Sequence, residues 1–120
     1  MDKDSVSFTI YGEPASKANS RKLVTFGKRP AFIKSDKARA YLKDFHSQVP
    51  SLDELLEGDL KVTMTIFYAS RRPDLDESVV LDAMQDHIYK NDRQVKEKHI
   101  FWGLDVLNPR SEILVEAIKE

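Results

Sequence analysis

Residues 60–77 read Leu-Lys-Val-Thr-Met-Thr-Ile-Phe-Tyr-Ala-Ser-Arg-Arg-Pro-Asp-Leu-Asp-Glu, and the interpretation of the whole chain starts from them. Apolar and polar residues alternate from Leu60 to Tyr68, which predicts a β-strand with one buried face. Two carboxylates follow, at Asp74 and Asp76. Side chains two residues apart in an extended chain project to the same face. We therefore expect both aspartates to point together, with Leu75 turned toward the core.

Clustered carboxylates repel one another unless a cation or a shared proton relieves the repulsion. Hard divalent ions prefer carboxylate oxygen, so a magnesium site is the first hypothesis. A third carboxylate, Asp92, can join the pair if the chain between them doubles back. The segment Glu77–Tyr89 predicts a helix that would do this, and the residues on its buried face are Val80, Leu81, Met84 and Ile88. Three carboxylates could hold one or two Mg²⁺ ions, or Mn²⁺ in their place.

A purely structural interpretation of the acidic pair stays open. Asp76 could cap the helix that follows, with Asp74 a solvated turn residue. Arg71 and Arg72 could hold phosphates or simply pair with the aspartates. A surface ion pair of that kind would contribute only about 0–1 kcal/mol.

The other predicted elements give the order β, loop, α, β, α, β, β. The 120 residues, 41% of them apolar, fit one compact domain over residues 1–120. The expected fold is α+β, with a mixed sheet and two to three helices. Besides the segments above, we predict strands over 5–11, 95–102 and 112–119, a helix from the N-cap Ser35 to about Ser47, and a short helix over 51–57.

A basic segment precedes the first helix. Residues 15–35 contain no acidic residue and carry Lys17, Arg21, Lys22, Lys28, Arg29 and Lys34. A short strand is conceivable at 23–26. The segment is either a solvated flexible loop or an arm that contacts nucleic-acid phosphates, because clustered cations release counterions from such backbones.

Some classes of protein are excluded by composition. The chain has no cysteine, which rules out disulfides, zinc–thiolate sites and cysteine nucleophiles. The N-terminus lacks the pattern of a signal peptide, and no segment is long enough to span a bilayer. We expect a soluble cytoplasmic protein without a membrane partner. Phe101 and Trp102 are expected in the core or at a dimer interface, and the three histidines lie outside the predicted site.

Three stretches together resemble the core signature of the RusA-type Holliday-junction resolvases. They are Arg72–Asp76, Leu81–Gln85 and Ile88–Val95, with Gly12-Glu13-Pro14 and Lys17, Asn19 and Arg21 resembling the family's N-terminal strand and basic loop. The resemblance implies a small homodimeric, Mg²⁺-dependent endonuclease, found in bacteria and phages, that nicks four-way DNA junctions symmetrically in recombination and repair. It implies that Asp74, Asp76 and Asp92 are the essential metal-binding carboxylates and that no organic cofactor is used.

The chain departs from that family pattern at three positions. Asn91 stands where a second acid is common, and Glu77 stands where asparagine is common, so either could add a metal-binding oxygen. Val80 occupies the position of a functional lysine found in some members. Lys90 or a residue of the basic segment could replace that lysine, or the role could be absent. The predicted helix is also about two residues shorter than is typical.

The leading hypothesis is therefore a magnesium-dependent, structure-selective DNA endonuclease. Its expected DNA-contacting residues are Lys17, Arg21, Lys22, Lys28, Arg29, Arg71 and Arg72. Contacts to the phosphate backbone carry little sequence information, so the sequence predicts selection by shape and no base preference. The alternative is a non-catalytic junction-binding protein with a structural metal. A D-x-D enzyme acting on sugar nucleotides is disfavoured, because 120 residues leave little room for a nucleotide-binding domain.

Overall fold

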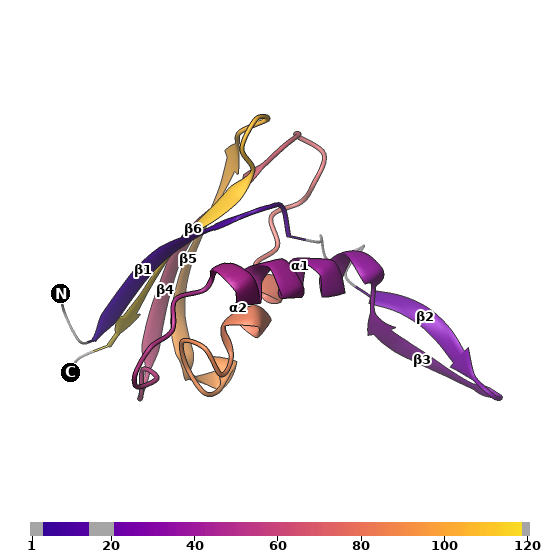
Figure 1. Ribbon diagram of the computed structural model, residues 1–120, viewed down its shortest axis with the longest axis horizontal. Helices are drawn as coiled ribbons and strands as arrows, with labels where there is room; N and C mark the ends of the chain where they lie inside the picture. Colours follow the sequence, from indigo (N-terminus) through magenta and orange to yellow (C-terminus); the bar gives the residue numbers. More distant parts are fainter. Residues whose placement is uncertain (1–3, 15–20, 119–120) are drawn as a thin grey trace.

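The computed structural model describes residues 4–14 and 21–118. It confirms an α+β fold with a mixed four-stranded sheet, two helices and a separate two-stranded hairpin (Figure 1). In chain order the elements are β1 (Ser5–Tyr11), β2 (Arg21–Phe26), β3 (Arg29–Lys34), α1 (Asp36–Gln48), β4 (Leu60–Tyr68), α2 (Ser78–Met84), the 3₁₀ helix η2 (Asp92–Gln94), β5 (Val95–Leu104) and β6 (Arg110–Ala117).

The direction of the strands determines where the sheet can carry a site. The strand order is β1-β6-β4-β5, with β6 antiparallel to both β1 and β4, and β5 parallel to β4. Strands β1, β4 and β5 therefore run in the same direction, and their carboxyl ends meet at one edge of the sheet. The turn after β1, the acidic loop after β4 and the β5–β6 turn all begin at this edge.

One face of the sheet is covered by α1 and α2 (Figure 1). Alternate residues of β4 from Leu60 to Tyr68 are buried, as the alternation in the sequence predicts. Helix α1 contributes Ala38, Tyr41 and Phe45 to the same core. Its start is also as predicted, because the Ser35 hydroxyl accepts a hydrogen bond from the Ala38 amide at 3.1 Å.

The second helix is shorter than the predicted Glu77–Tyr89. Helix α2 ends at Met84, after which Asp86 adopts a left-handed conformation with φ of 68°. The Tyr89 hydroxyl turns back and donates to the Leu81 carbonyl at 2.6 Å, which satisfies one of the free acceptors at the helix end. The turn still buries Ile88 and Tyr89 completely. The apolar stripe was therefore predicted correctly, although its last residue lies outside the helix.

The predicted short helix over 51–57 is absent. Its backbone bonds to distant partners instead: the Leu56 amide donates to the Ile88 carbonyl at 2.8 Å, and Gln94 Nε2 donates to the Leu56 carbonyl at 3.1 Å. The capping-box pattern at Ser51 was misleading because these tertiary hydrogen bonds replace a local helix.

Within the described part of the basic segment, residues 21–34 form a β-hairpin rather than a loop with one short strand. Strands β2 and β3 pair from Arg21↔Lys34 to Phe26↔Arg29, and Gly27 at the turn has a φ of 64°, which suits glycine. The hairpin extends away from the body of the molecule (Figure 1). The longest dimension of the molecule, hairpin included, is 49 Å. The strands predicted over 95–102 and 112–119 are present as β5 and β6 with slightly different ends.

Candidate active site

The acidic loop is anchored by an aromatic pair on the sheet. The Tyr68 hydroxyl accepts a hydrogen bond from the Asp76 amide and donates one to the Asp74 carbonyl, each at 3.2 Å. Trp102 Nε1 donates to the Pro73 carbonyl at 3.2 Å, and the Tyr68 and Trp102 rings stack with centroids 6.0 Å apart. The backbone of the Asp-Leu-Asp motif is thereby fixed from the end of β4 and from its neighbour β5.

Asp76 is the buried member of the acidic pair. Its side chain is 7% exposed, whereas Asp74 is exposed and Leu75 is 37% exposed. The prediction that both aspartates point together while Leu75 turns toward the core is therefore wrong, because Asp76 is buried and both Asp74 and Leu75 are exposed. The hydrogen bonds to Tyr68 orient the loop so that Asp76 turns inward instead.

The two carboxylate oxygens of Asp76 have different surroundings. Oδ1 accepts hydrogen bonds from the Ser78 amide at 3.0 Å and from the Ser78 hydroxyl at 2.7 Å, at the start of α2. Oδ2 is buried and has no hydrogen-bond partner among the described residues. A buried carboxylate oxygen without a partner is costly unless something binds it. Asp76 thus bonds to the helix start through one oxygen, while its other oxygen is buried without a hydrogen-bond partner among the described residues.

Further carboxylates surround this loop. Burial raises the pKa of Tyr68, the hydrogen bond from the Asp76 amide lowers it, and the carboxylates of Asp76, Glu13 and Glu77 raise it by smaller amounts. The charges of Glu13 and Glu77 therefore act on the Tyr68 hydroxyl. Sequence reasoning assigned Glu13 only to the turn that closes the first strand. Its place at the site follows from the parallel arrangement of β1 and β4, which no local pattern reveals.

A lysine side chain also lies beside the loop. Lys98 Nζ lies 3.7 Å from a Glu77 carboxylate oxygen, with the lysine side chain 48% and the glutamate side chain 23% exposed. Lys98 pairs in register with Val62, so it projects from the face of the sheet that the helices cover. Val80 is fully buried, and Lys90 forms an ion pair with Asp86 at 2.9 Å. The sequence suggested Lys90 or a residue of the basic segment as the replacement for the lysine that some family members have at the position of Val80. It did not point to Lys98.

Asp92 lies in a separate acidic neighbourhood. Its amide donates to Gln85 Oε1 at 3.1 Å, and Gln85 Nε2 donates to Asp82 Oδ1 at 3.0 Å. Burial raises the pKa of Tyr89, and the carboxylates of Asp92 and Asp82 raise it further. Asp82 is therefore the close acidic neighbour of Asp92.

Asn91 has a structural role at the start of η2. Its side-chain oxygen accepts from the Arg93 amide at 2.9 Å, and Gln94 Oε1 accepts from the Asn91 amide at 3.0 Å. This reciprocal capping explains the Asn-Asp-Arg-Gln order without requiring Asn91 to bind a metal. Within the described ranges, no group of three or more His, Cys, Asp and Glu side chains has the spacing of a metal site. The convergence of Asp74, Asp76 and Asp92 on one ion stays a prediction.

The predicted DNA-contacting residues occupy two places. Arg71 and Arg72 are exposed beside the acidic loop, and Lys28 and Arg29 are exposed at the turn of the β2–β3 hairpin. Arg21 and Lys22 belong to β2 by their backbone, and their side chains are not among those described. Lys17 lies outside the described residues. Among the described helices, none is long and apolar enough to cross a membrane.

Comparison with known proteins identifies the class of protein to which this fold and site belong. The family model that describes an endodeoxyribonuclease, RusA, matches residues 12–116, from the turn after β1 almost to the end of β6. The match defines an enzyme class that cuts DNA internally. The chain belongs to the RusA endodeoxyribonuclease family. A search of curated proteins found no match.

Proposed function

We propose that the protein is a Mg²⁺-dependent endonuclease that resolves four-way DNA junctions by paired, symmetric nicks, acting as a homodimer in recombination and repair. Membership of the RusA family supports the DNA-cutting activity. The observation that supports the proposed dependence on Mg²⁺ is the buried Oδ2 atom of Asp76, which has no hydrogen-bond partner among the described residues. A homodimer suits a four-way junction, because two-fold symmetry supplies two equivalent sites for two incisions.

The residues at the acidic loop fit a hard divalent cation. Carboxylate oxygens from Asp76, Asp74 and Glu77 offer the donor type that Mg²⁺ prefers, and Tyr68 and Trp102 hold the loop that carries them. Mg²⁺ held there would supply Lewis-acid stabilisation of charge developing on a phosphodiester. Arg71 and Arg72, exposed at the same loop, would bind the flanking phosphates and orient the strand to be cut.

Asp92 and Asp82 would enter the site as a second acidic pair. Gln85 joins them in one hydrogen-bonded unit, because its side chain bonds both the Asp82 carboxylate in α2 and the Asp92 amide in η2. We infer that DNA or a second copy of the chain brings this pair toward the acidic loop. Glu13, near Tyr68, is a further candidate ligand from the end of β1.

One assay distinguishes the proposed endonuclease from the alternative, a junction-binding protein without catalytic activity. The protein is incubated with a labelled four-way junction or a linear duplex of the same sequence, with Mg²⁺ or with EDTA, beside Asp74→Asn. We expect paired nicks in the junction only with the wild-type protein and Mg²⁺, while Asp74→Asn still binds the junction. Binding without cutting under several divalent ions would favour the alternative. Equal cutting of the linear duplex would refute junction selectivity.

Lys98 is proposed as the cation that offsets the carboxylates of this loop, the role that a lysine at the position of Val80 would otherwise fill. Its ion pair with Glu77 supports this assignment. Lys98→Gln should cut more slowly and require less Mg²⁺ for half-maximal rate, because a positive charge that repels the ion is removed. Lys98→Arg should recover part of the rate. Lys61→Gln is a matched control, because Lys61 pairs with Glu116 at 3.8 Å on another part of the sheet. Equal rates for the Lys98→Gln variant and the control would contradict the role.

A further inference from the structure

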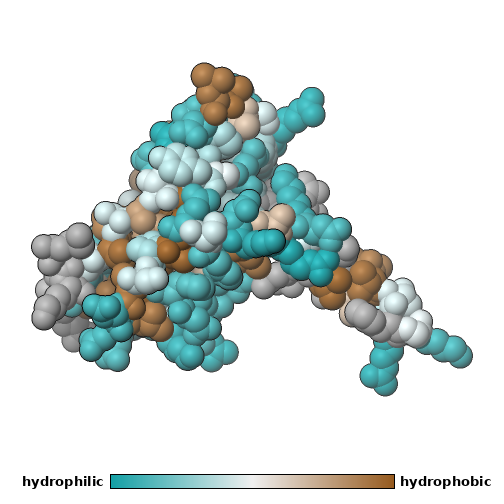
Figure 2. Space-filling view, viewed as in Figure 1, coloured by the Kyte–Doolittle hydropathy of each residue, from teal (hydrophilic) through white to brown (hydrophobic). Residues whose placement is uncertain are grey.

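An exposed apolar tip lies at the turn between β5 and β6. Val106 is 64% and Leu107 95% exposed. The turn projects at the top of Figure 1, and Figure 2 shows a hydrophobic knob at the same place, bordered by hydrophilic surface. A single exposed leucine is ordinary in a soluble protein. Two adjacent exposed apolar side chains indicate a binding role only if the turn that carries them is rigid and lies close to the candidate site.

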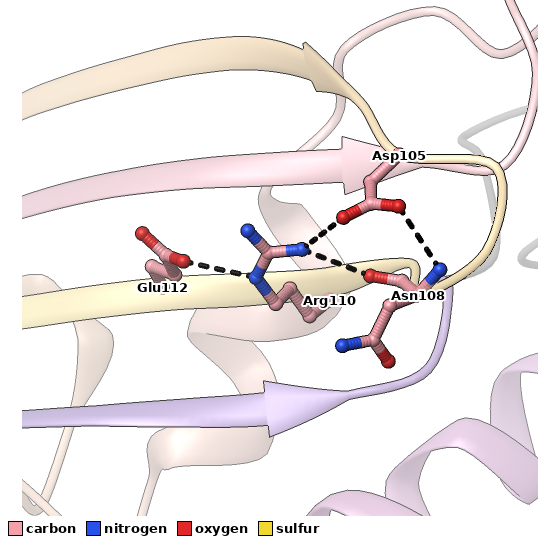
Figure 3. Close-up of polar contacts among 4 residues, drawn as sticks. All are labelled: Asp105, Asn108, Arg110 and Glu112. Carbon is pink, nitrogen blue, oxygen red and sulfur yellow. Dashed lines mark hydrogen bonds and ion pairs between the residues drawn. The ribbon is translucent and has the colours of Figure 1, made fainter.

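The turn is held by an internal polar frame (Figure 3). Asp105 Oδ1 accepts from the Asn108 amide at 3.1 Å, and Arg110 Nη1 donates to Asp105 Oδ2 at 2.6 Å and to the Asn108 carbonyl at 3.1 Å. The Arg110 guanidinium also lies over the Phe67 ring, 4.1 Å from its centroid. Because the frame fixes the turn in advance, a ligand that contacts the tip need not supply the free energy to order it.

The frame also joins the turn to the elements of the acidic site. The Asp105 amide donates to the Tyr68 carbonyl at 2.9 Å, and the Pro109 carbonyl accepts from the Gly12 amide at 2.9 Å. Tyr68 is the residue that anchors the acidic loop, and Gly12 immediately precedes Glu13. The apolar tip, the acidic loop and the exposed Arg71 therefore occupy the same edge of the molecule.

The size and surroundings of the tip indicate what it can contact. A stable protein interface buries about 800 Å² on each partner, far more than two side chains can provide. Apolar wedges of one or two side chains are, by contrast, sufficient to enter a base step and unstack it. Arg71 and Arg72 would attract phosphates to this edge. The free energy needed to unstack bases is lowest at a branch point, because stacking is already interrupted there.

We propose that the Val106–Leu107 tip is an apolar wedge that contacts unstacked bases at the branch point of DNA. The inference rests on the proposed function, because it assumes that branched DNA occupies this edge. It adds a contact that distinguishes a junction from a continuous duplex, which the phosphate-binding arginines cannot do by themselves. The frame of Asp105, Asn108 and Arg110 positions the wedge without touching the DNA.

The test uses a four-way junction with 2-aminopurine at the branch point, in EDTA so that nothing is cut. Wild-type protein should increase the fluorescence as the base unstacks. The double variant Val106→Ser/Leu107→Ser should give a much smaller increase and bind the junction roughly tenfold more weakly, the loss expected for about one base-stacking contact. Its affinity for linear duplex should be unchanged. Leu107→Met should behave as wild type, and so should Ile118→Ser, which changes another exposed apolar residue beyond the far end of β6.

Each outcome decides the proposal. Thermal unfolding checks that the variants fold, as expected for side chains that are exposed. An equal fluorescence increase with the double variant, or no increase with wild type, overturns the wedge. Sedimentation that shows the double variant to be monomeric and the wild type dimeric overturns it in favour of a contact between copies. Cutting is measured separately with Mg²⁺, so wild type that unstacks the branch point without cutting refutes the proposed function and leaves the wedge standing.

Discussion

At the scale of single residues, Tyr68 connects the sheet to the proposed chemistry. It ends β4, is completely buried, and uses one hydroxyl group to bond the backbone on both sides of Leu75. Burial raises its pKa above the ordinary 10.0 and the carboxylates around it add to the rise, so the hydroxyl remains protonated and able to donate at neutral pH. Its position explains why Asp76 turns inward and Leu75 outward.

Tyr68→Phe should reduce both stability and activity. The substitution leaves the buried Asp76 amide without an acceptor, which should lower the free energy of unfolding by about 1–3 kcal/mol, as measured by urea unfolding. The cleavage rate should fall as well, because the Asp76 carboxylate is less firmly positioned. Tyr11→Phe, at a 53% exposed tyrosine, is the control that should change neither. A Tyr68→Phe protein with wild-type stability would show that the loop does not depend on this hydroxyl.

The sequence predicted some of these residues and could not predict others. Asp74, Asp76 and Glu77 were predicted because they are adjacent in the chain and follow a clear strand. Glu13 and Lys98 were not, because their positions beside the loop depend on where β1 and β5 lie in the sheet. The sequence could not predict which oxygen of Asp76 lacks a partner. Ser78 bonds one of the two oxygens, and that contact follows from the three-dimensional course of the loop.

At the scale of elements, the β4–α2–β5 unit was predicted in outline and differs at its ends. Periodicity identified the strand, the buried helix stripe and the following strand, which the structure shows to be parallel to β4. It extended α2 too far because Ile88 continues the apolar spacing, while the left-handed Asp86 had already ended the helix. The pairing of β2 with β3 was missed because only one short strand, at 23–26, was considered in the basic segment, whereas Gly27 forms a turn that leads into a second strand.

The β5–β6 turn should lose stability at acid pH through Asp105. The hydrogen bond from Arg110 lowers the pKa of Asp105 below its ordinary 3.8 in the folded protein. A group with a lowered folded pKa stabilises the native state above its unfolded pKa, and that contribution disappears as pH falls through the folded pKa. The difference in unfolding free energy between wild type and Asp105→Asn should therefore be constant from neutral pH to about 4 and shrink below it. A difference that persists unchanged in strong acid would contradict the ion pair.

At the scale of the whole molecule, the acidic edge of the sheet and the basic hairpin are separate parts of one extended shape (Figure 1). The two strands of the hairpin make their main contacts with each other. A two-stranded hairpin is marginally stable alone in water, so an arm of this kind gains most from a ligand that lies along it. The composition identified a basic segment and left open whether it was a flexible loop or an arm, and the hairpin and its separation from the core could be seen only in the structure.

The double variant Lys28→Gln/Arg29→Gln should weaken binding to junction and duplex DNA alike. Both side chains are exposed at the hairpin turn, where they can reach phosphates but have no base to select. Each lost phosphate contact lowers the slope of log Kd against log salt concentration by about 0.9, so the slope should fall by about 1–2. Fluorescence anisotropy over a range of salt concentrations measures it. The matched variant Lys37→Gln/Arg39→Gln, at exposed positions of α1, should leave the slope unchanged. An unchanged slope for the hairpin variant would remove the arm from the DNA-binding surface.

The most direct test of the central claim, that the acidic loop is a metal-dependent cutting centre, is single-turnover cleavage of a four-way junction by Asp76→Asn. Asparagine retains an oxygen that can accept from Ser78, so α2 should still begin normally, while the charge on the unpartnered atom is lost. We predict paired nicks by wild type with Mg²⁺ and none with EDTA. Asp76→Asn should bind the junction with unchanged affinity and cut it slower by at least the roughly 10–100-fold typical of losing a residue that supports a metal ligand. Cutting by Asp76→Asn at the wild-type rate would contradict the account and reduce Asp76 to a helix cap.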